Sequence, residues 1–197
     1  RAEVTQLHEK GTFEPVDPMK LGIKYSASGK LEPMAYADAA FLVHHDAVSR
    51  TGVIVMVAGG VVYGSSSKQK LVTKSSAEAE LVALCDGATA ALMVRGFMSH
   101  QGHQLEPARL MEDNKSAIDM VKAGKPTSRR TKHISMRFYF VKQHVDSGEC
   151  VIEYCPTGEM LADLMTKPVV GSLFLQLRGQ IVCETPEVRL CTYGVTQ

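Results

Sequence analysis

The sequence predicts an α/β fold in which helices cover the faces of a mixed β-sheet. Two patterns predict this fold. Three strand-like segments precede the first long helix, after which strand-like and helix-like segments alternate along the chain. The helical segments also carry helix signals, namely a capping box at the start of the long helix and apolar residues spaced by four, three and four in a later one.

The first three strands are expected to pair in an antiparallel manner. Met34–Phe41 is a short apolar segment that contains one carboxylate, Asp38. Gly52–Val57 and Val61–Ser65 are rich in β-branched residues, and the glycine-containing residues 58–60 separate them. Two such runs joined by a short glycine-containing connection predict a hairpin.

The long helix is expected to begin at Ser75. A hydroxyl group three residues before Glu78 matches the capping box, in which the carboxylate reaches back to the amide of the cap. Apolar side chains then continue at helical spacing until Gly102.

The later elements are shorter and are bounded by glycine or proline. Helices commonly end at a glycine, and proline breaks both helices and strands. The expected elements are a strand at Arg109–Glu112, a helix at Asn114–Ala123, a helix from Ile134 to Gly148, a strand at Cys150–Cys155, a short helix at Glu159–Thr166 and a helix at Ser172–Ile181.

Length and composition describe one globular domain with short extensions. The chain has 197 residues, of which 45% are hydrophobic, and its 22 basic and 21 acidic side chains give a net charge of +1. No apolar run approaches the roughly 18 residues of a membrane helix, and the N-terminus lacks the apolar stretch of a signal peptide. The five cysteines are scattered and odd in number, which is typical of reduced thiols. We therefore expect an intracellular protein outside the membrane.

Four carboxylates are candidates for a metal site. Asp38 lies inside an apolar strand, where a charge is costly unless it is paired or bound to metal. Glu80, Asp113 and Asp163 lie near the ends of other expected elements. If the four groups converged, they would repel one another unless a cation such as Mg²⁺ or Mn²⁺ were present. Two such ions about 4 Å apart can hydrolyse a phosphodiester. By spacing alone, the alternative is four solvated surface groups.

Several words of the sequence resemble the ribonuclease H domain of copia-type retrotransposon Pol polyproteins. They are YADAAF, SRTGVIVMVAGGVVYGSSSKQKLVTKSSAEAELVAL, MEDNKSAI and SRRTKHISMRFYFVKQHVDSGECVIEYCPTGEMLADLMTKP, in this order over roughly residues 34 to 180. The resemblance implies a ribonuclease H-like mixed five-stranded sheet flanked by helices. It also implies hydrolysis of the RNA strand of an RNA–DNA hybrid with two Mg²⁺ or Mn²⁺ ions per site.

The resemblance also implies which residues are catalytic and bind the metal. The aspartate of the YSDAD-like word falls on Asp38, and the second glutamate of the TEAE-like word falls on Glu80. The CDN-like word places its aspartate at Asp113, and the QLADILTK-like word places its aspartate at Asp163. In the family pattern Asp38 would be central to both ions, and Asp163 would hold the ion nearest the attacking water.

The sequence departs from the family pattern at several positions. The family often has Asp and Trp where Ala40 and Phe41 stand, Trp where Met93 stands, and Asp where Ser135 stands. Residues 156–159 lack the histidine that many cellular ribonucleases H use in product release. None of these departures removes an implied ligand, but together they indicate a diverged copy in which slow turnover is expected.

Basic side chains gather in two segments although the net charge is near zero. Residues 125–142 carry six Lys and Arg and no Asp or Glu, and residues 68–74 carry three lysines. These segments are expected to contact hybrid phosphates, and the alternative is a solvated helix face. The expected nucleic-acid-binding residues are Lys68, Lys70, Asn114, Arg129, Arg130, Lys132 and His133.

We expect three parts in the chain. Residues 1–33 form an extension with a short helix at Val4–Glu9, residues 34–181 form the ribonuclease H-like domain, and residues 182–197 form a tail. The N-terminal stretch VTQLHEKGTFEPVDPMKL resembles the region upstream of the reverse transcriptase in such polyproteins. This resemblance implies that the polymerase has been lost from between this stretch and the ribonuclease H-like domain.

Two other functions are compatible with the sequence. One is a domesticated, catalytically silent module that binds nucleic acid or joins other subunits of a larger complex through the two extensions. The other is an integrase or transposase, which shares the fold and the metal chemistry. The order of strands and the fourth carboxylate in MLADLMTK fit ribonuclease H better.

Overall fold

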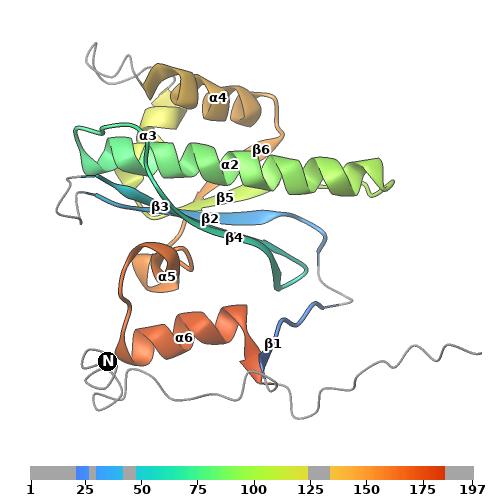
Figure 1. Ribbon diagram of the computed structural model, residues 1–197. Coiled ribbons are helices and arrows are strands. Elements are labelled where there is room, and N and C mark those ends of the chain that lie inside the picture. Colours follow the sequence, from blue (N-terminus) through green and yellow to red (C-terminus); the bar gives the residue numbers. More distant parts are fainter. Residues whose placement is uncertain (1–20, 27–29, 42–47, 124–133, 185–197) are drawn as a thin grey trace, which may run out of the picture.

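A mixed five-stranded sheet forms the centre of the molecule (Figure 1). The computed structural model describes residues 21–26, 30–41, 48–123 and 134–184. The strands are β2 (Met34–Ala40), β3 (Arg50–Val57), β4 (Gly60–Lys68), β5 (Ala108–Glu112) and β6 (Cys150–Tyr154), in the order β4-β3-β2-β5-β6. The β2–β3 and β3–β4 pairs are antiparallel, and the β2–β5 and β5–β6 pairs are parallel. The expected mixed sheet with its three antiparallel strands is confirmed.

A tight turn joins β3 to β4, as the sequence predicts. Ala58 and Gly59 both have positive φ, of 52° and 81°. Positive φ at both central residues is the backbone of a type I′ hairpin turn, whose twist matches that of the flanking strands. Both strands are longer than expected because pairing continues from Arg50 to Lys68 beyond the apolar core of the hairpin.

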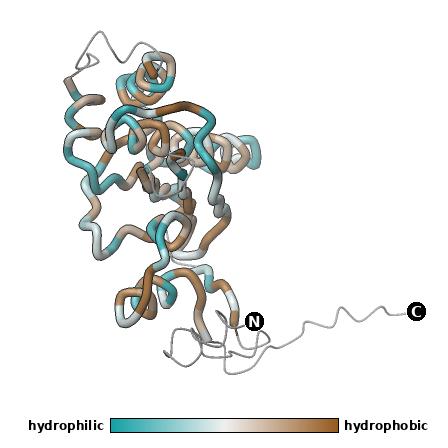
Figure 2. Tube along the Cα trace, turned by 60° about the vertical axis from the view of Figure 1, so that its left-hand side comes forward, coloured by the Kyte–Doolittle hydropathy of each residue, from teal (hydrophilic) through white to brown (hydrophobic). Residues whose placement is uncertain are grey.

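Helices cover both faces of the sheet (Figure 1). The helices α2 (Ser76–His100), α3 (Lys115–Ala123) and α4 (Ser135–Asp146) lie on one side, and α5 (Asp163–Thr166) and α6 (Gly171–Ile181) lie on the other. Figure 2 shows hydrophobic and hydrophilic residues mixed along the helical coils. Phe138 and Val141, two of the residues that predicted α4, are buried in the main core.

The long helix α2 is the core helix of the domain. Ser75 caps it as predicted, because the amide of Glu78 donates to Ser75 Oγ. The Glu78 carboxylate, however, accepts from the amide of Lys74, one residue before the cap. By length and composition α2 could cross a membrane, yet half of its most apolar window is buried inside the protein. The helix also packs closely against β2, since a Cβ placed on Gly87 would lie 3.1 Å from the Ala37 Cβ.

The expected short helix at Glu159–Thr166 is confirmed only over its last four residues, Asp163–Thr166. The segment instead contains a 3-10 turn, η3 (Thr157–Glu159), followed by the four-residue α5. Met160 has extended backbone between them, with φ −72° and ψ 97°. Met160 and Ala162 are fully buried against Cys155 and Tyr36, and this packing takes the chain out of the helical path.

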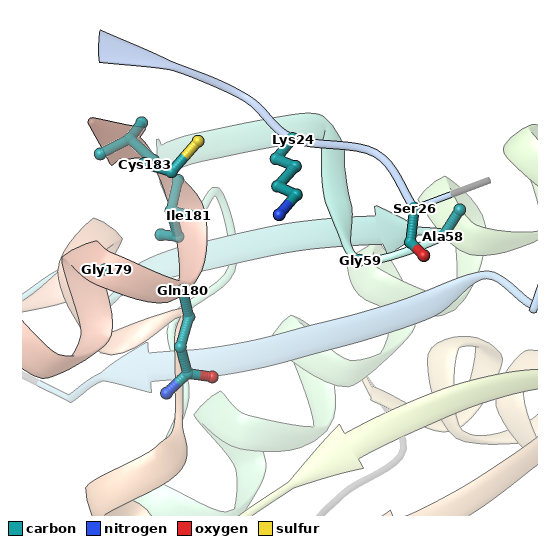
Figure 3. A pocket seen from close by; sticks show the side chains of 9 residues that line it. Lys24, Ser26, Ala58, Gly59, Gly179, Gln180, Ile181 and Cys183 are labelled. Carbon is teal, nitrogen blue, oxygen red and sulfur yellow. The ribbon is translucent and has the colours of Figure 1, made fainter. Parts of the chain in front are cut away.

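Two short strands join segments that are distant in sequence. β1 (Leu21–Gly22) pairs with β7 (Cys183–Glu184) in an antiparallel manner, so the predicted extension and tail meet beside the domain. Between this pair and the β3–β4 turn lies a cavity of about 230 Å³, lined mainly by backbone and small residues (Figure 3). Among the described residues that line it, Lys24 alone is charged. The predicted domain limits at 33 and 182 stay predictions, and Val4–Glu9 lies outside the described residues.

Candidate metal centre

The candidate site lies where β2 and β5 separate. These parallel strands pair only from Met34 opposite Arg109 to Tyr36 opposite Met111. Beyond this point β2 no longer pairs with β5, although it still pairs with β3. The Ala39 amide donates to Glu80 Oε2 of α2, at 2.8 Å. The gap between the strand ends therefore admits side chains from other elements.

Three of the four predicted carboxylates meet in this gap. One ligand oxygen each from Asp38, Glu80 and Asp113 lies within 4.8 Å of the other two. Asp38 is 1% exposed and Glu80 is 7% exposed, whereas Asp113 is half-buried and accepts from Thr157 Oγ1 at 2.9 Å. Strand β2, helix α2 and the end of β5 thus each contribute one group.

The fourth carboxylate, Asp163, is linked to Asp38 through a lysine. Lys167 Nζ lies 3.1 Å from Asp38 Oδ1 and 2.8 Å from Asp163 Oδ1. The hydroxyl of Thr166 donates to the other oxygen of Asp38, Oδ2. Asp163 therefore borders the cluster, and α5 engages both oxygens of Asp38.

A glycine on β3 lets α5 approach so closely. Gly52 lies opposite Asp38 in the β2–β3 register. A Cβ at this position would lie 2.7 Å from Thr166 Cγ2 and 2.8 Å from the carbonyl oxygen of Ala162. Only glycine leaves this space open, so residue 52 determines where α5 meets the sheet.

A fifth carboxylate, Glu112, is close enough to the cluster to interact with Asp38 and Asp113, and it is fully buried. Its Oε1 accepts from the Asn114 amide at 3.0 Å, while its Oε2 has no partner among the described residues. Burial, and then the nearby charges of Asp113 and Asp38, raise the pKa of Glu112 well above its ordinary value, although the backbone amides oppose this shift. Glu112 is not among the ligands predicted from the sequence, since the word MEDNKSAI predicts only Asp113.

The same crowding acts on Glu80. Burial, followed by the charges of Glu112, Asp38 and Asp113, raises the pKa of Glu80 to about 10. Asp163 behaves similarly, because burial raises its pKa while the hydrogen bond from Lys167 opposes the increase. The metal-free protein therefore favours the protonated forms of Glu80 and Glu112.

These residues fit a hard divalent cation. Mg²⁺ binds oxygen ligands at about 2.1 Å, so two of its ligands are roughly 3 to 4 Å apart. The spacing among Asp38, Glu80 and Asp113 requires only small side-chain movements to reach this geometry. Glu112 also leaves one buried carboxyl oxygen, Oε2, without a hydrogen-bond partner among the described residues near these ligands.

Three of the seven predicted nucleic-acid-binding residues lie within the described part of the chain. Lys68 ends β4, and Lys70 is exposed in the connection to α2. Asn114 instead caps α3, because its Oδ1 accepts from the amide of Ala117 at 3.1 Å. The remaining four, Arg129, Arg130, Lys132 and His133, lie outside the described residues.

Lys167 and Thr166 are the other groups that the sequence analysis missed. A signal for Lys167 was available, since Asp163 precedes it by four residues and such pairs meet on one helix face. Thr166 gave no comparable signal, because its contact with Asp38 joins residues that are 128 positions apart.

The homologues of this chain are retrovirus-related Pol polyproteins from copia-type transposons. The chain is 31% identical over 162 residues to the Pol polyprotein from transposon RE2 of Arabidopsis thaliana, a match that covers 81% of this chain and 11% of that protein. The chain spans about a tenth of the length of the curated relatives that it matches. No protein-family profile matches it.

The structural neighbours are ribonuclease H domains. The N-terminal ribonuclease H domain of a Mycobacterium tuberculosis protein superposes with a TM-score of 0.52 at 14% identity, covering 70% of this chain and 91% of that one. LC11-RNase H1, solved in complex with an RNA/DNA hybrid, gives a TM-score of 0.52 at 12% identity, covering 71% and 96%. The expected ribonuclease H fold is confirmed.

Proposed function

We propose that this chain, a homologue of transposon Pol polyproteins with a ribonuclease H fold, is a divalent-metal-dependent nuclease that hydrolyses the RNA strand of RNA–DNA hybrids. The observation that carries the proposal is the convergence of Asp38, Glu80 and Asp113 at the point where β2 and β5 separate. The complex of the similar LC11-RNase H1 with a hybrid supports the choice of substrate.

The proposed ligands are Asp38, Glu80, Asp113 and Asp163, which would hold two Mg²⁺ or Mn²⁺ ions. The bound ions would supply an activated water and stabilise the leaving oxygen of the phosphodiester. The protein's own contribution is to hold the carboxylates in place. The Ala39 amide positions Glu80, Thr157 positions Asp113, and Thr166 positions Asp38.

Basic side chains would bind the hybrid. Lys70 and the basic residues of segment 125–142 are expected to contact phosphates, which gives affinity without base specificity. The 2′-hydroxyls of the RNA strand would distinguish the hybrid from duplex DNA. Partners that bind through residues 1–33 and 182–197 stay a prediction.

The proposal is tested with purified protein, Mg²⁺ or Mn²⁺, and a labelled hybrid, with duplex DNA and duplex RNA in parallel. We expect cleavage of the RNA strand of the hybrid alone, and a loss of at least about 100-fold in rate for Asp113→Asn, which removes one metal-binding charge. Glu153→Gln on β6 is the control, because its carboxylate pairs with Arg109 away from the cluster.

Three results would contradict this function. Hybrid cleavage that is equal in wild type and Asp113→Asn would mean that the cluster is not the active site. Tight hybrid binding without cleavage under any metal condition would favour the catalytically silent module. Cleavage of duplex DNA in preference to the hybrid would favour an integrase-like or transposase-like nuclease.

A further inference from the structure

Lys167 occupies the position between two carboxylates of the candidate metal centre. Its Nζ is 3.1 Å from Asp38 Oδ1 and 2.8 Å from Asp163 Oδ1, so one ammonium group bridges them. Among the described residues, no other Lys or Arg forms an ion pair with either carboxylate. The proposed function makes these same two groups ligands of a divalent ion.

The burial of the three side chains is unequal. The side chains of Asp38 and Asp163 are 1% and 5% exposed, whereas that of Lys167 is 41% exposed. The carboxylates are fixed in the interior, because β2 holds Asp38 and the start of α5 holds Asp163. The lysine reaches them from the surface, so its ammonium can withdraw into water without opening the core.

We propose that Lys167 is a built-in counter-ion, which stabilises Asp38 and Asp163 in the metal-free protein and competes with a divalent cation for them. This inference rests on the proposed metal centre. Without metal, the ammonium offsets part of the repulsion within the carboxylate cluster. A divalent cation brings twice the charge to the same oxygens, and the lysine then moves toward solvent.

The environment of Lys167 agrees with a charged resting state. Burial by itself would lower the pKa of Lys167, but the hydrogen bonds and charges of Asp163 and Asp38 outweigh it and raise the pKa overall. The ammonium is therefore present at any pH at which the protein would work, and displacement by metal requires movement of a cation rather than loss of a proton.

If Lys167 competes with the metal, removing its charge should strengthen metal binding but destabilise the metal-free protein. A purely structural role of Lys167 would not strengthen metal binding. Lys167→Met keeps most of the apolar stem and removes the charge. We expect Mn²⁺ to bind about tenfold more tightly to Lys167→Met than to wild type, because one partly exposed charge pair no longer has to be broken. The Tm in EDTA should fall, since Asp38 would lose its cationic partner.

Two controls test the specificity of this effect. Lys115→Met removes a charge from the start of α3, where Lys115 Nζ lies 4.9 Å from the centre of the Tyr154 ring. It should leave Mn²⁺ affinity nearly unchanged if pairing, rather than general charge, is responsible. Lys142→Met breaks a lysine–aspartate pair of the same spacing on α4, and it should lower the Tm in EDTA less than Lys167→Met.

Mn²⁺ binding is measured on the full chain by titration calorimetry and by the electron paramagnetic resonance signal of free Mn²⁺. If Lys167→Met bound Mn²⁺ with unchanged or weaker affinity, the competing role of Lys167 would be wrong, while the metal centre itself would stand. If wild type and Lys167→Met both failed to bind Mn²⁺, the metal centre of the proposed function would be wrong as well.

A measurement on the unmodified protein covers the case in which Lys167→Met does not fold. The Cε resonance of Lys167 is followed by NMR during a Mg²⁺ titration. We expect it to shift toward the value of a free lysine, with the same midpoint as Mg²⁺ binding measured by calorimetry. A resonance that stays constant while Mg²⁺ binds would contradict the displacement.

Discussion

At the scale of single residues, the site is dominated by carboxylates that the fold forces together. Glu80 illustrates the cost. Its Oε2 accepts from the Ala39 amide, which favours the charged form, yet burial and the neighbouring carboxylates raise its pKa to about 10. A group whose folded-state pKa is raised stabilises the protein fully below its unfolded-state pKa, and this contribution is lost as the pH rises toward the folded-state pKa.

The metal-free protein should therefore become less stable as the pH rises from 6 to 9. Glu80→Gln, which stays neutral, should weaken this dependence, whereas Glu153→Gln should not change it, because Arg109 lowers the pKa of Glu153. Urea unfolding in EDTA at pH 6 and pH 9 measures the effect. The same loss of stability between these pH values in wild type and Glu80→Gln would contradict it.

Saturating Mg²⁺ should reverse the trend in wild type, since the cation favours the ionised carboxylates and binds more tightly as they lose their protons. The increase in Tm caused by Mg²⁺ should thus be larger at pH 9 than at pH 6. An increase that does not depend on pH would mean that the metal does not bind at the buried cluster.

At the scale of elements, the position of α5 depends on the sheet beneath it. Helix α5 has only four residues, and it begins without a side-chain cap. Its place is instead determined by contacts with Gly52 on β3 and by the bonds from Thr166 and Lys167 to Asp38. The sheet and the metal centre therefore share one close contact.

Gly52→Ala should displace α5 and destabilise the protein by about 1 to 3 kcal/mol, as is usual for overpacking. It should also weaken Mn²⁺ binding, because Asp163 moves with α5. Gly64→Ala on β4 is the matched control, since a Cβ there would meet nothing within 4 Å. Urea unfolding and calorimetry measure both effects, and equal behaviour of the two variants would contradict the argument.

At the scale of the whole molecule, the net charge of +1 conceals a strong separation of charge. Acidic groups converge between β2 and β5, and the segment at 125–142 carries six basic residues without an acidic one. A cation bound at the acidic centre would offset the charge of the carboxylates, and the basic residues would remain available to bind phosphates. Hybrid binding should therefore weaken steeply with salt, although the protein is almost neutral.

Arg129→Gln combined with Arg130→Gln should reduce the slope of log affinity against log salt by about 2, one for each lost phosphate contact. Hybrid binding is measured by fluorescence anisotropy with the Asp113→Asn background, in which cleavage is prevented. Lys24→Gln, beside the cavity between β1 and the β3–β4 turn, should leave the slope unchanged. If the double variant kept the wild-type slope, Arg129 and Arg130 would not contact the hybrid phosphates.

Local signals in the sequence determined most of the elements. The capping box at Ser75 and the apolar spacing through Phe138 and Val141 depend only on neighbours along the chain, so they predict α2 and α4 well. The interval 159–166 was predicted poorly, because the burial of Met160 against Cys155 comes from tertiary packing and overrides the local helical pattern.

The four carboxylates of the candidate site were named from the sequence, since each lies in a recognisable word. Their arrangement was decided only by the tertiary structure. The sheet register places Gly52 opposite Asp38, which lets Thr166 and Lys167 contact Asp38. The end of β5 buries Glu112 close to Glu80 and Asp113. Ion pairing and burial depend on distances between segments far apart in the chain, and no local pattern encodes those distances.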